Sequence, residues 1–247
     1  MKNFIKLPKL SKGDQVAVIS PSAGLPQIFP WVQDLGLDRM KTIFGLVPVE
    51  YPTTRILGSS LEDRARDVMD AFADPKNKAV FTSIGGSDQI KLIKHLDPQI
   101  FIDNPKPFFG FSDNTHLHNF LWNLGIPSFY GGGVMNQFGM NSKMFDMTVN
   151  SIKHALFDEG EYELEVSSDY SDEGLDWSIK ENLDQPRKLD TNMGLVWDGD
   201  IDARGVLWGG CVESMIVQLS TAKYLPKDED LEGIAVDNCT IMLSTHP

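Results

Sequence analysis

The chain has 247 residues, of which 41% are hydrophobic, and a formal net charge of −13 at neutral pH. This length suffices for one large core or two small ones, and so acidic a surface repels phosphate backbones, which excludes nucleic acid as an expected partner. No apolar run reaches the length of a membrane span and none follows the basic residues near the N-terminus, so we expect no membrane contact, no signal peptide and a cytoplasmic protein.

The first elements that the pattern predicts are a strand and a helix. The strand covers residues 15–20, a β-rich run ended by a proline and small residues, as is typical of a buried strand in a parallel sheet. The helix begins at one of two capping boxes, Ser59 with Glu62 or Ser60 with Asp63, and apolar residues then recur at helical spacing.

Two further units of strand, tight turn and helix follow, with strands at residues 79–83 and 107–111 and helices at 88–96 and 114–124. Repetition of this unit is typical of an α/β domain with a mostly parallel sheet. The first turn contains Gly85 and Gly86, and the second contains Ser112 and Asp113. Both turns lie at the carboxyl ends of strands, where the ligands of such sheets gather.

The pattern changes beyond residue 160. Tyr162, Leu164 and Val166 alternate with acidic residues, as in a half-exposed strand, and a polar, acidic stretch follows. The remaining expected elements are a strand at residues 203–208, a turn at Gly209 and Gly210, a helix at 211–222 and a strand at 240–244.

The change in pattern predicts a domain boundary near residue 165. It divides the chain into an N-terminal α/β domain of residues 1–165 and a smaller, incomplete C-terminal α/β domain of residues 166–247. Cys211 and Cys239 are too few for a disulfide framework or a zinc site, so we expect two buried thiols and no metal.

Ser112 is the sharpest chemical candidate. A serine on a strand-to-helix turn presents its hydroxyl at the top of a sheet, and the helix start behind it offers free backbone N–H groups. That arrangement suits a nucleophile whose tetrahedral intermediate needs an oxyanion hole. The segment is not Gly-x-Ser-x-Gly, because Asn114 occupies the last position, and on this pattern alone a helix cap is the more common explanation.

The paired glycines Gly85 and Gly86 allow two interpretations. Glycine lets the backbone adopt a positive φ or approach a ligand closely, so the pair could supply an oxyanion N–H group or cradle a phosphate. No Walker-type lysine follows and there is no Gly-x-Gly-x-x-Gly, so a nucleotide-binding α/β module is not favoured.

The order and spacing of several short motifs resemble the LD-carboxypeptidase family of serine peptidases over essentially the whole chain. The matching pieces are residues 10–14, 20–22, 64, 70–72, 84–86, 104–106, 110–117, 130–132 and 205–214. The resemblance implies a flavodoxin- or Rossmann-like parallel-sheet domain followed by a smaller α/β domain.

The resemblance also implies a site. Ser112 would be the nucleophile, and the backbone N–H groups of Gly86 and Asp113 would form the oxyanion hole, with Gly85 beside the substrate. The reaction would be hydrolysis of a peptide bond near a free carboxyl end, without metal or cofactor, in a homodimer. A Glu and a His from the later domain complete the triad in this family.

Within the family, the polar stretch is more similar to the microcin C immunity (MccF-like) branch than to murein-recycling enzymes. The similarity rests on Trp177, Asn192 and residues 197–199. Relatives of this branch hydrolyse peptidyl-nucleotide antibiotics, and an aromatic ring there can stack on the base. The implied partner is a short peptide, a murein tetrapeptide or a peptidyl-nucleotide. The alternative for Trp177 is a ring that packs between domains.

The chain departs from the family near its end. Ser244 stands where the family has its Glu, and the sequence ends at Pro247, before the position of the family's His. We therefore expect a C-terminally truncated relative, and an inactive homologue that only binds such ligands is the alternative. Glu213, near the start of the helix at 211–222, is expected to bind substrate or to cap that helix.

No other histidine is favoured as the base. His116 follows Ser112 by one helical turn and could approach the hydroxyl, but a packed helix histidine is the more common role. His95, His118 and His154 have the same helical setting, and His246 lies at the terminus, where chains are usually too mobile to position a base.

Overall fold

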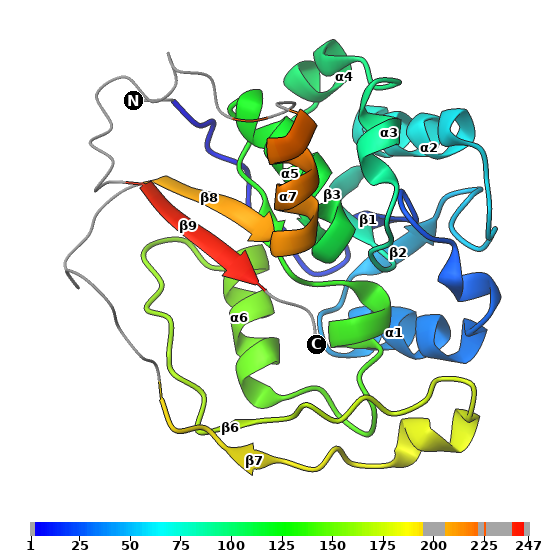
Figure 1. The fold of residues 1–247 in the computed structure, drawn as a ribbon, viewed down its shortest axis with the longest axis vertical. Coiled ribbons are helices and arrows are strands. Elements are labelled where there is room, and N and C mark those ends of the chain that lie inside the picture. The colour runs from blue at the N-terminus through cyan, green and yellow to red at the C-terminus, as the bar shows by residue number, and fades with distance from the viewer. Residues whose placement is uncertain (1–2, 195–205, 222–224, 226–238, 245–247) are drawn as a thin grey trace.

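The computed structural model describes residues 3–194, 206–221, 225 and 239–244, the last of these as backbone alone. Its centre is a sheet of five parallel strands in the order β2-β1-β3-β4-β5 (Figure 1). They are β1 (Gln15–Ile19), β2 (Val47–Glu50), β3 (Asn77–Thr82), β4 (Phe108–Gly110) and β5 (Phe129–Tyr130). This is the flavodoxin-like order, which reverses direction between β1 and β3. The predicted parallel α/β fold is confirmed.

Helices cover both faces of this sheet (Figure 1). One face carries α1 (Pro30–Thr42), the π-helical turn η3 (Val134–Phe138) and α6 (Asp146–Phe157). The other face carries α2 (Leu61–Ala73), α3 (Gln89–Ile93), α4 (Pro98–Asp103) and α5 (Thr115–Asn123). A short 3-10 turn, η1 (Leu25–Gln27), precedes α1.

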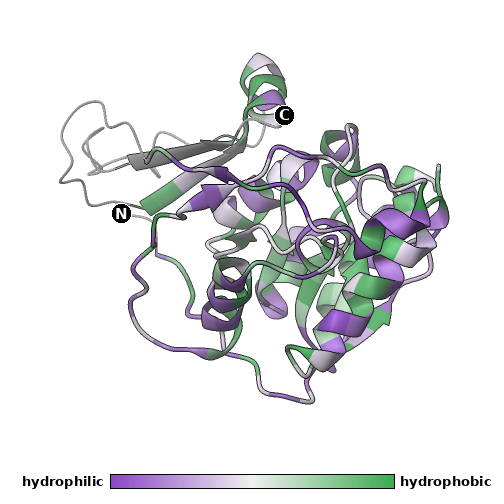
Figure 2. Cartoon of the chain, turned by 90° about the horizontal axis from the view of Figure 1, so that it is seen from below, coloured by the Kyte–Doolittle hydropathy of each residue, from purple (hydrophilic) through white to green (hydrophobic). Residues whose placement is uncertain are grey.

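The sheet separates two hydrophobic cores, because successive side chains of a strand point to opposite faces. In β1, Ala17 and Ile19 belong to the core under α2 to α5, while Val16 and Val18 belong to the core under α1 and α6. All four side chains are fully buried. Figure 2 shows the apolar residues concentrated in the sheet and on the inner sides of the helices.

Beyond α6 the described residues form two small sheets. β6 (Asp169–Tyr170) and β7 (Asp190–Thr191) pair antiparallel, with the 3-10 turn η4 (Lys180–Asp184) between them. β8 (Val206–Cys211) and β9 (Cys239–Ser244) pair in parallel, and α7 (Val212–Thr221) follows β8 directly. β8 and α7 pack against α5 (Figure 1), where the indole of Trp122 donates to the Leu207 carbonyl at 3.2 Å.

Most of the predicted elements are confirmed, with their ends shifted. Of the two capping boxes, the structure uses the second: Ser60 is the N-cap of α2, and its hydroxyl accepts from the Asp63 backbone N–H at 3.0 Å. The helix expected over residues 88–96 is shorter, as α3. The elements α1, α4, β2, β5, β6 and β7 are among those that were not predicted. β2 is an edge strand with Pro48 inside it, which weakens the strand signal.

Two predictions about the second half are wrong. The strand expected at Tyr162, Leu164 and Val166 is absent, because this alternating segment is irregular, has no sheet to join and leaves Leu164 71% exposed. Gly209 and Gly210 do not form a turn but lie inside β8 with φ values of 152° and 150°. At position 210 glycine is needed because a β-carbon there would lie 2.3 Å from the Thr115 side chain of α5.

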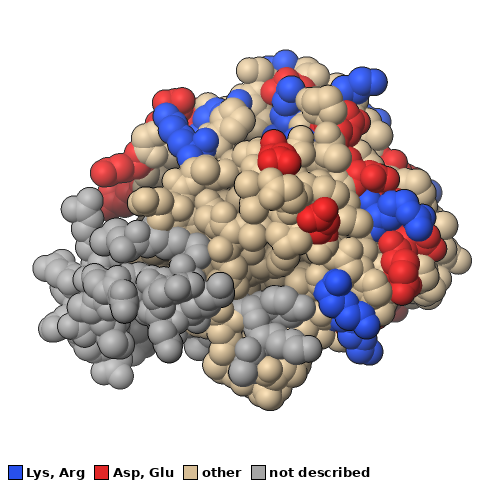
Figure 3. All heavy atoms as spheres, turned by 90° about the horizontal axis from the view of Figure 1, so that it is seen from above, with Lys and Arg blue, Asp and Glu red and all other residues tan. Residues whose placement is uncertain are grey.

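The described surface carries charges of both signs. On the face drawn in Figure 3, basic and acidic side chains are interspersed along the upper and right-hand rim, and isolated acidic side chains lie in the otherwise uncharged middle. Among the helices of the described residues, none combines the length and the apolar character needed to cross a membrane.

Candidate active site

Ser112 lies where β4 ends and a helix begins. It opens the 3-10 turn η2 (Ser112–Asn114), which leads directly into α5. Its φ of 60° is in the left-handed region, which costs a residue with a β-carbon roughly 1 kcal/mol. Such strain persists only where the surrounding structure holds it, and it is concentrated at functional sites. The strand-to-helix turn predicted at Ser112 is therefore present and strained.

The turn after β3 lies against Ser112. A β-carbon at Gly85 would lie 2.8 Å from the β-carbon of Ser112 and 3.4 Å from the backbone nitrogen of Asp113. A β-carbon at Gly86 would lie 2.7 Å from the β-carbon of Ser22, which follows β1. Both glycines are therefore required by the close approach of neighbouring chain segments. The structure brings the two predicted turns into contact.

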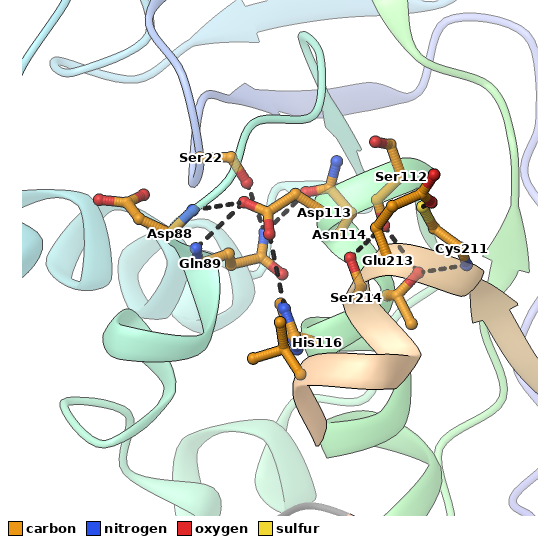
Figure 4. A network of polar contacts seen from close by, with 12 residues as sticks. Ser22, Asp88, Gln89, Ser112, Asp113, Asn114, His116, Cys211, Glu213 and Ser214 are labelled. Atoms are coloured by element: carbon orange, nitrogen blue, oxygen red, sulfur yellow. Dashed lines mark hydrogen bonds and ion pairs between the residues drawn. The ribbon is translucent and has the colours of Figure 1, made fainter. Parts of the chain in front are cut away.

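The side chain of Asp113 joins these two turns (Figure 4). This buried carboxylate accepts hydrogen bonds through Oδ2 from the backbone N–H groups of Asp88, at 3.1 Å, and Gln89, at 3.0 Å. These N–H groups open α3 and have no carbonyl acceptor within their own helix. The carboxylate of one turn therefore binds the backbone of the other.

Gln89 and Arg64 connect the same turns to the end of β1. The buried Gln89 amide donates to the Ser22 hydroxyl at 3.1 Å and to the Asn114 side-chain oxygen at 2.7 Å. The guanidinium of Arg64 donates to both oxygens of Asp88, at 2.9 and 3.0 Å, and to the Ser22 carbonyl at 2.6 Å. These bonds from Arg64 lower the pKa of the Asp88 carboxyl. One polar network thus holds the carboxyl ends of β1, β3 and β4.

A cavity of about 210 Å³ lies beside this network. Its walls come from residues 22–24, 56–59, 64 and 86–88. It therefore opens where the strand order reverses between β1 and β3, the place at which doubly wound sheets bind their ligands.

Both histidines of α5 are buried and have polar partners. His116 Nε2 lies 3.5 Å from Asp113 Oδ1, and its Nδ1 lies 3.1 Å from the amide nitrogen of Gln218. His118 Nε2 lies 2.9 Å from the Gly110 carbonyl. Burial lowers the pKa of His116 and lowers the pKa of His118 to about 4, so His118 is uncharged at neutral pH. The packed role expected of both is the observed one.

The start of α7 is bound to the Ser112 turn. The Thr115 hydroxyl donates to the Ser112 carbonyl at 2.7 Å and accepts from the Cys211 backbone N–H at 2.9 Å. The buried Cys211 thiol donates to Glu213 Oε2 at 2.7 Å. Burial, with this hydrogen bond, raises the pKa of the thiol. Glu213 is thus a partner of Cys211, and its expected role in substrate binding stays a prediction.

β9 ends at the same edge as β8. The register pairs Cys211 with Ser244, so the backbone of the position where the family has its Glu lies near the start of α7. The side chains of Ser244 and Cys239, and the whole of residues 197–199 and His246, lie outside the described residues. Within the described part, no three His, Cys, Asp or Glu side chains are grouped as metal ligands would be.

Trp177 packs beside the start of α1. Its ring meets that of Phe29 edge to face with 5.7 Å between centroids, and its carbonyl accepts from the Trp31 indole at 2.8 Å. The side chain is half-buried. The packing interpretation describes these contacts, and stacking on a base stays a prediction. Asn192 donates to the Ser167 carbonyl at 2.9 Å.

Tyr130, like Gln89 and the side chain of Asp113, makes a contact in the site that the sequence did not indicate. Its hydroxyl oxygen accepts from the Ser112 backbone N–H at 3.0 Å, and its ring lies 5.5 Å from the His118 ring. In the sequence, residues 130–132 stood out only as part of the family resemblance. The signal that could have indicated this contact is the position of Tyr130, an aromatic residue at the carboxyl end of β5, the strand next to β4.

This fold and site define a class: doubly wound α/β proteins that present a strained serine at the carboxyl edge of a parallel sheet. The model of the LD-carboxypeptidase N-terminal domain matches residues 16–131, which include both turns and the five strands of the central sheet except for the first residue of β1. Residues 16–131 of the chain therefore belong to the LD-carboxypeptidase N-terminal domain family.

Curated relatives agree with this family. A provisionally named carboxypeptidase of Treponema pallidum is 31% identical over 225 residues, which cover 88% of this chain and 63% of the relative. The microcin C7 self-immunity protein MccF of Escherichia coli is 26% identical over 218 residues, which cover 81% of this chain and 62% of MccF. The chain therefore spans a little under two thirds of the length of these relatives.

Solved structures share the fold. An MccF-like protein from Bacillus anthracis superposes with a TM-score of 0.83 at 30% identity, over 97% of this chain and 69% of its own. An MccF-like protein from Streptococcus pneumoniae, solved in complex with AMP, superposes with a TM-score of 0.80 at 26% identity, over 94% of this chain and 73% of its own.

Proposed function

We propose that this protein is a serine-type carboxypeptidase that hydrolyses an amide bond near a free carboxyl end, in a short peptide or a peptidyl-nucleotide. The observation that carries the proposal is the left-handed backbone of Ser112, held at the end of β4 with Gly85 packed against its side chain. A serine oxygen in this position can attack a carbonyl carbon held above the carboxyl edge of the sheet.

The proposed oxyanion hole consists of the backbone N–H groups of Gly86 and Asp113. They belong to the two turns that the structure brings into contact, and Asp113 lies at the start of a helix, where N–H groups are free of helical partners. Removing one donor from such a hole typically slows the reaction by about 100-fold to 1,000-fold. The cavity beside Gly86 is available for a part of the substrate next to the scissile bond.

Attack by a serine hydroxyl also requires a base. In Figure 4 the His116 ring lies on the side of Asp113 away from the Ser112 hydroxyl, and the His116 nitrogens face Asp113 and Gln218. His118 is held by Gly110. Neither is therefore proposed as the base. The backbone of Ser244, the position where the family has its Glu, pairs with Cys211, whose N–H group donates to Thr115 beside the Ser112 turn.

The nucleotide half of the proposal is supported by the relatives. The MccF-like protein from Streptococcus pneumoniae, which shares the fold of this chain, was solved in complex with AMP. MccF of Escherichia coli is named for microcin C7 self-immunity. Trp177 is the proposed stacking residue. A homodimer, which the resemblance implies, stays a prediction.

The test uses a murein tetrapeptide that ends in D-Ala and a non-cleaved control peptide, together with a peptidyl-adenylate. Mass spectrometry should detect a released C-terminal product with this chain and none with Ser112→Ala. Hydrolysis that survives Ser112→Ala would exclude Ser112 as the nucleophile. Trp177→Ala should slow hydrolysis of the peptidyl-adenylate more than that of the tetrapeptide, and equal losses on both would assign Trp177 to packing.

The second candidate function is binding without catalysis, and Ser244 at the family's Glu position favours it. It predicts that the chain binds the peptidyl-adenylate but releases no product. Isothermal titration beside the hydrolysis assay separates the two functions.

A further inference from the structure

We propose that the Asp113 carboxylate is a positioning residue that fixes the relative placement of the two turns whose N–H groups form the proposed oxyanion hole. The inference rests on the proposed function for its catalytic consequence. It concerns the side chain of Asp113, whereas the proposed oxyanion donor is the backbone N–H of the same residue.

The first support is the geometry of the bridge. Asp113 follows Ser112 directly, while its Oδ2 binds the N–H groups of Asp88 and Gln89, which lie just beyond Gly86 in the other turn. The Asp113 side chain is only 4% exposed, so water competes little for these bonds. Hydrogen bonds to an ionised acceptor are roughly twice as strong as neutral ones. A single carboxylate therefore couples the two donor turns.

The second support is the close packing of the two turns at Gly85. The space for a β-carbon there is already occupied by Ser112, whose Oγ would lie 3.0 Å away. If the turn after β3 moved toward Ser112, it would collide, and if it moved away, the Asp113 hydrogen bonds would lengthen. Contact on one side and hydrogen bonds on the other define one separation.

The third support is that both ends of the bridge are themselves held. The backbone N–H group of Asp88 donates a hydrogen bond to Asp113. The buried Arg64 in turn donates to both carboxylate oxygens of Asp88. The other oxygen of Asp113 faces His116, which in turn contacts Gln218 of α7. The bridge thus has rigid attachments on α2 and α7, as a positioning group requires.

The competing explanation is that Asp113 only stabilises the fold. Asp67 provides the matched control, because it is also a buried carboxylate that accepts a backbone N–H, from Thr53 at 2.6 Å, and a hydroxyl from the same residue. Asp67 lies on α2, and its hydrogen-bond partner Thr53 belongs to neither turn. Asp67→Ala and Asp113→Ala should therefore cost similar stability while differing in their effect on catalysis.

The experiment compares kcat, KM and thermal unfolding for Asp113→Asn, Asp113→Ala, Asp67→Asn and Asp67→Ala. Asp113→Asn keeps the shape and the backbone N–H, and we expect its kcat to fall about 10-fold with KM changed less than about two-fold; Asp113→Ala should lose about 100-fold, as for a misplacement of about 1 Å. The Asp67 variants should keep kcat. A kcat that falls no more at Asp113 than at Asp67 would overturn the proposal.

Amide hydrogen exchange distinguishes this proposal from the proposed function. In Asp113→Asn, the amides of Asp88 and Gln89 should exchange faster, while those of β1 do not. Unchanged exchange at both amides overturns the bridge whatever the activity. If the native chain hydrolyses none of the substrates, or Ser112→Ala remains active, the proposed function fails, and faster exchange at these amides still supports the bridge.

Discussion

At Gly85, the space of one hydrogen atom determines whether Ser112 can hold its position. A methyl group there would lie 2.8 Å from the Ser112 β-carbon, closer than real side chains pack. We predict that Gly85→Ala lowers kcat by about 100-fold, the cost of displacing a reacting group by about 1 Å. Steady-state kinetics on the best substrate of the native chain measure the loss.

The control for this change is Gly174→Ala, because a β-carbon at Gly174 meets open space. It should leave kcat unchanged. If Gly85→Ala were as active as Gly174→Ala, the two turns would not need their observed contact, and the placement of Ser112 would have to be explained otherwise.

At the same scale, the sequence could predict residues that a local pattern marks. Ser112 follows a β-rich run, and Gly85 and Gly86 stand together after another, so strand-end reasoning found all three. The side-chain role of Asp113, and the roles of Gln89 and Tyr130, could not be found in this way. Their partners come from distant segments, and only the register of the folded sheet brings them together.

Among the elements, α2 has an unusual cap at its C-terminal end. The buried ammonium group of Lys106, from the loop before β4, donates to the carbonyls of Phe72 and Asp74. Cations are favourable at this end of a helix, but burial lowers the pKa of Lys106 to about 8. In the unfolded chain a lysine has a pKa of about 10.4.

This difference predicts the pH dependence of stability. Between pH 8 and roughly 10.4 the unfolded state binds more protons than the folded state, so the free energy of unfolding should rise with pH in that interval. Below pH 8 both states are protonated and the cost of burying the charge is fully present. Urea unfolding at pH 7.5 and pH 9.5 should show this rise in the native chain and a smaller rise in Lys106→Met. Equal rises would mean that other groups cause it.

Element prediction succeeded where a run of residues was buried and bounded by turns. β1, β3 and β4 have this form, and α2 has both an apolar face and a serine cap. The segment around Leu164 shows the limit of the method. Alternation describes a strand only if a partner strand is present, and whether one is present depends on the rest of the molecule.

In the whole molecule, β8 and α7 are joined to the sheet domain through α5. Gly210 is the tightest point, since a β-carbon there would lie 2.3 Å from Thr115 Cγ2. We predict that Gly210→Ala displaces β8 and α7 from α5 and lowers the melting temperature by several degrees, as a loss of about 1–2 kcal/mol would. Limited proteolysis should then cut the irregular segment of residues 158–168 faster.

Leu219→Ala is the matched control for this change, because Leu219 lies on α7 but is 60% exposed. It should melt and be digested like the native chain. If Gly210→Ala behaved the same way, the seam between α5 and β8 would not hold the two parts together. The same result would bear on the predicted domain boundary near residue 165, because a protease cuts slowly at that boundary as long as β8 and α7 stay packed against α5.

The left-handed backbone of Ser112 has a consequence for how this family can change over time. A β-carbon in that conformation is a standing cost of roughly 1 kcal/mol, which glycine would not carry. A lineage no longer selected for hydrolysis would gain stability by replacing the serine with glycine. Glycine at this position in a relative would therefore indicate that hydrolysis is no longer under selection there. This chain keeps both the serine and Gly85, whose missing side chain leaves room for it.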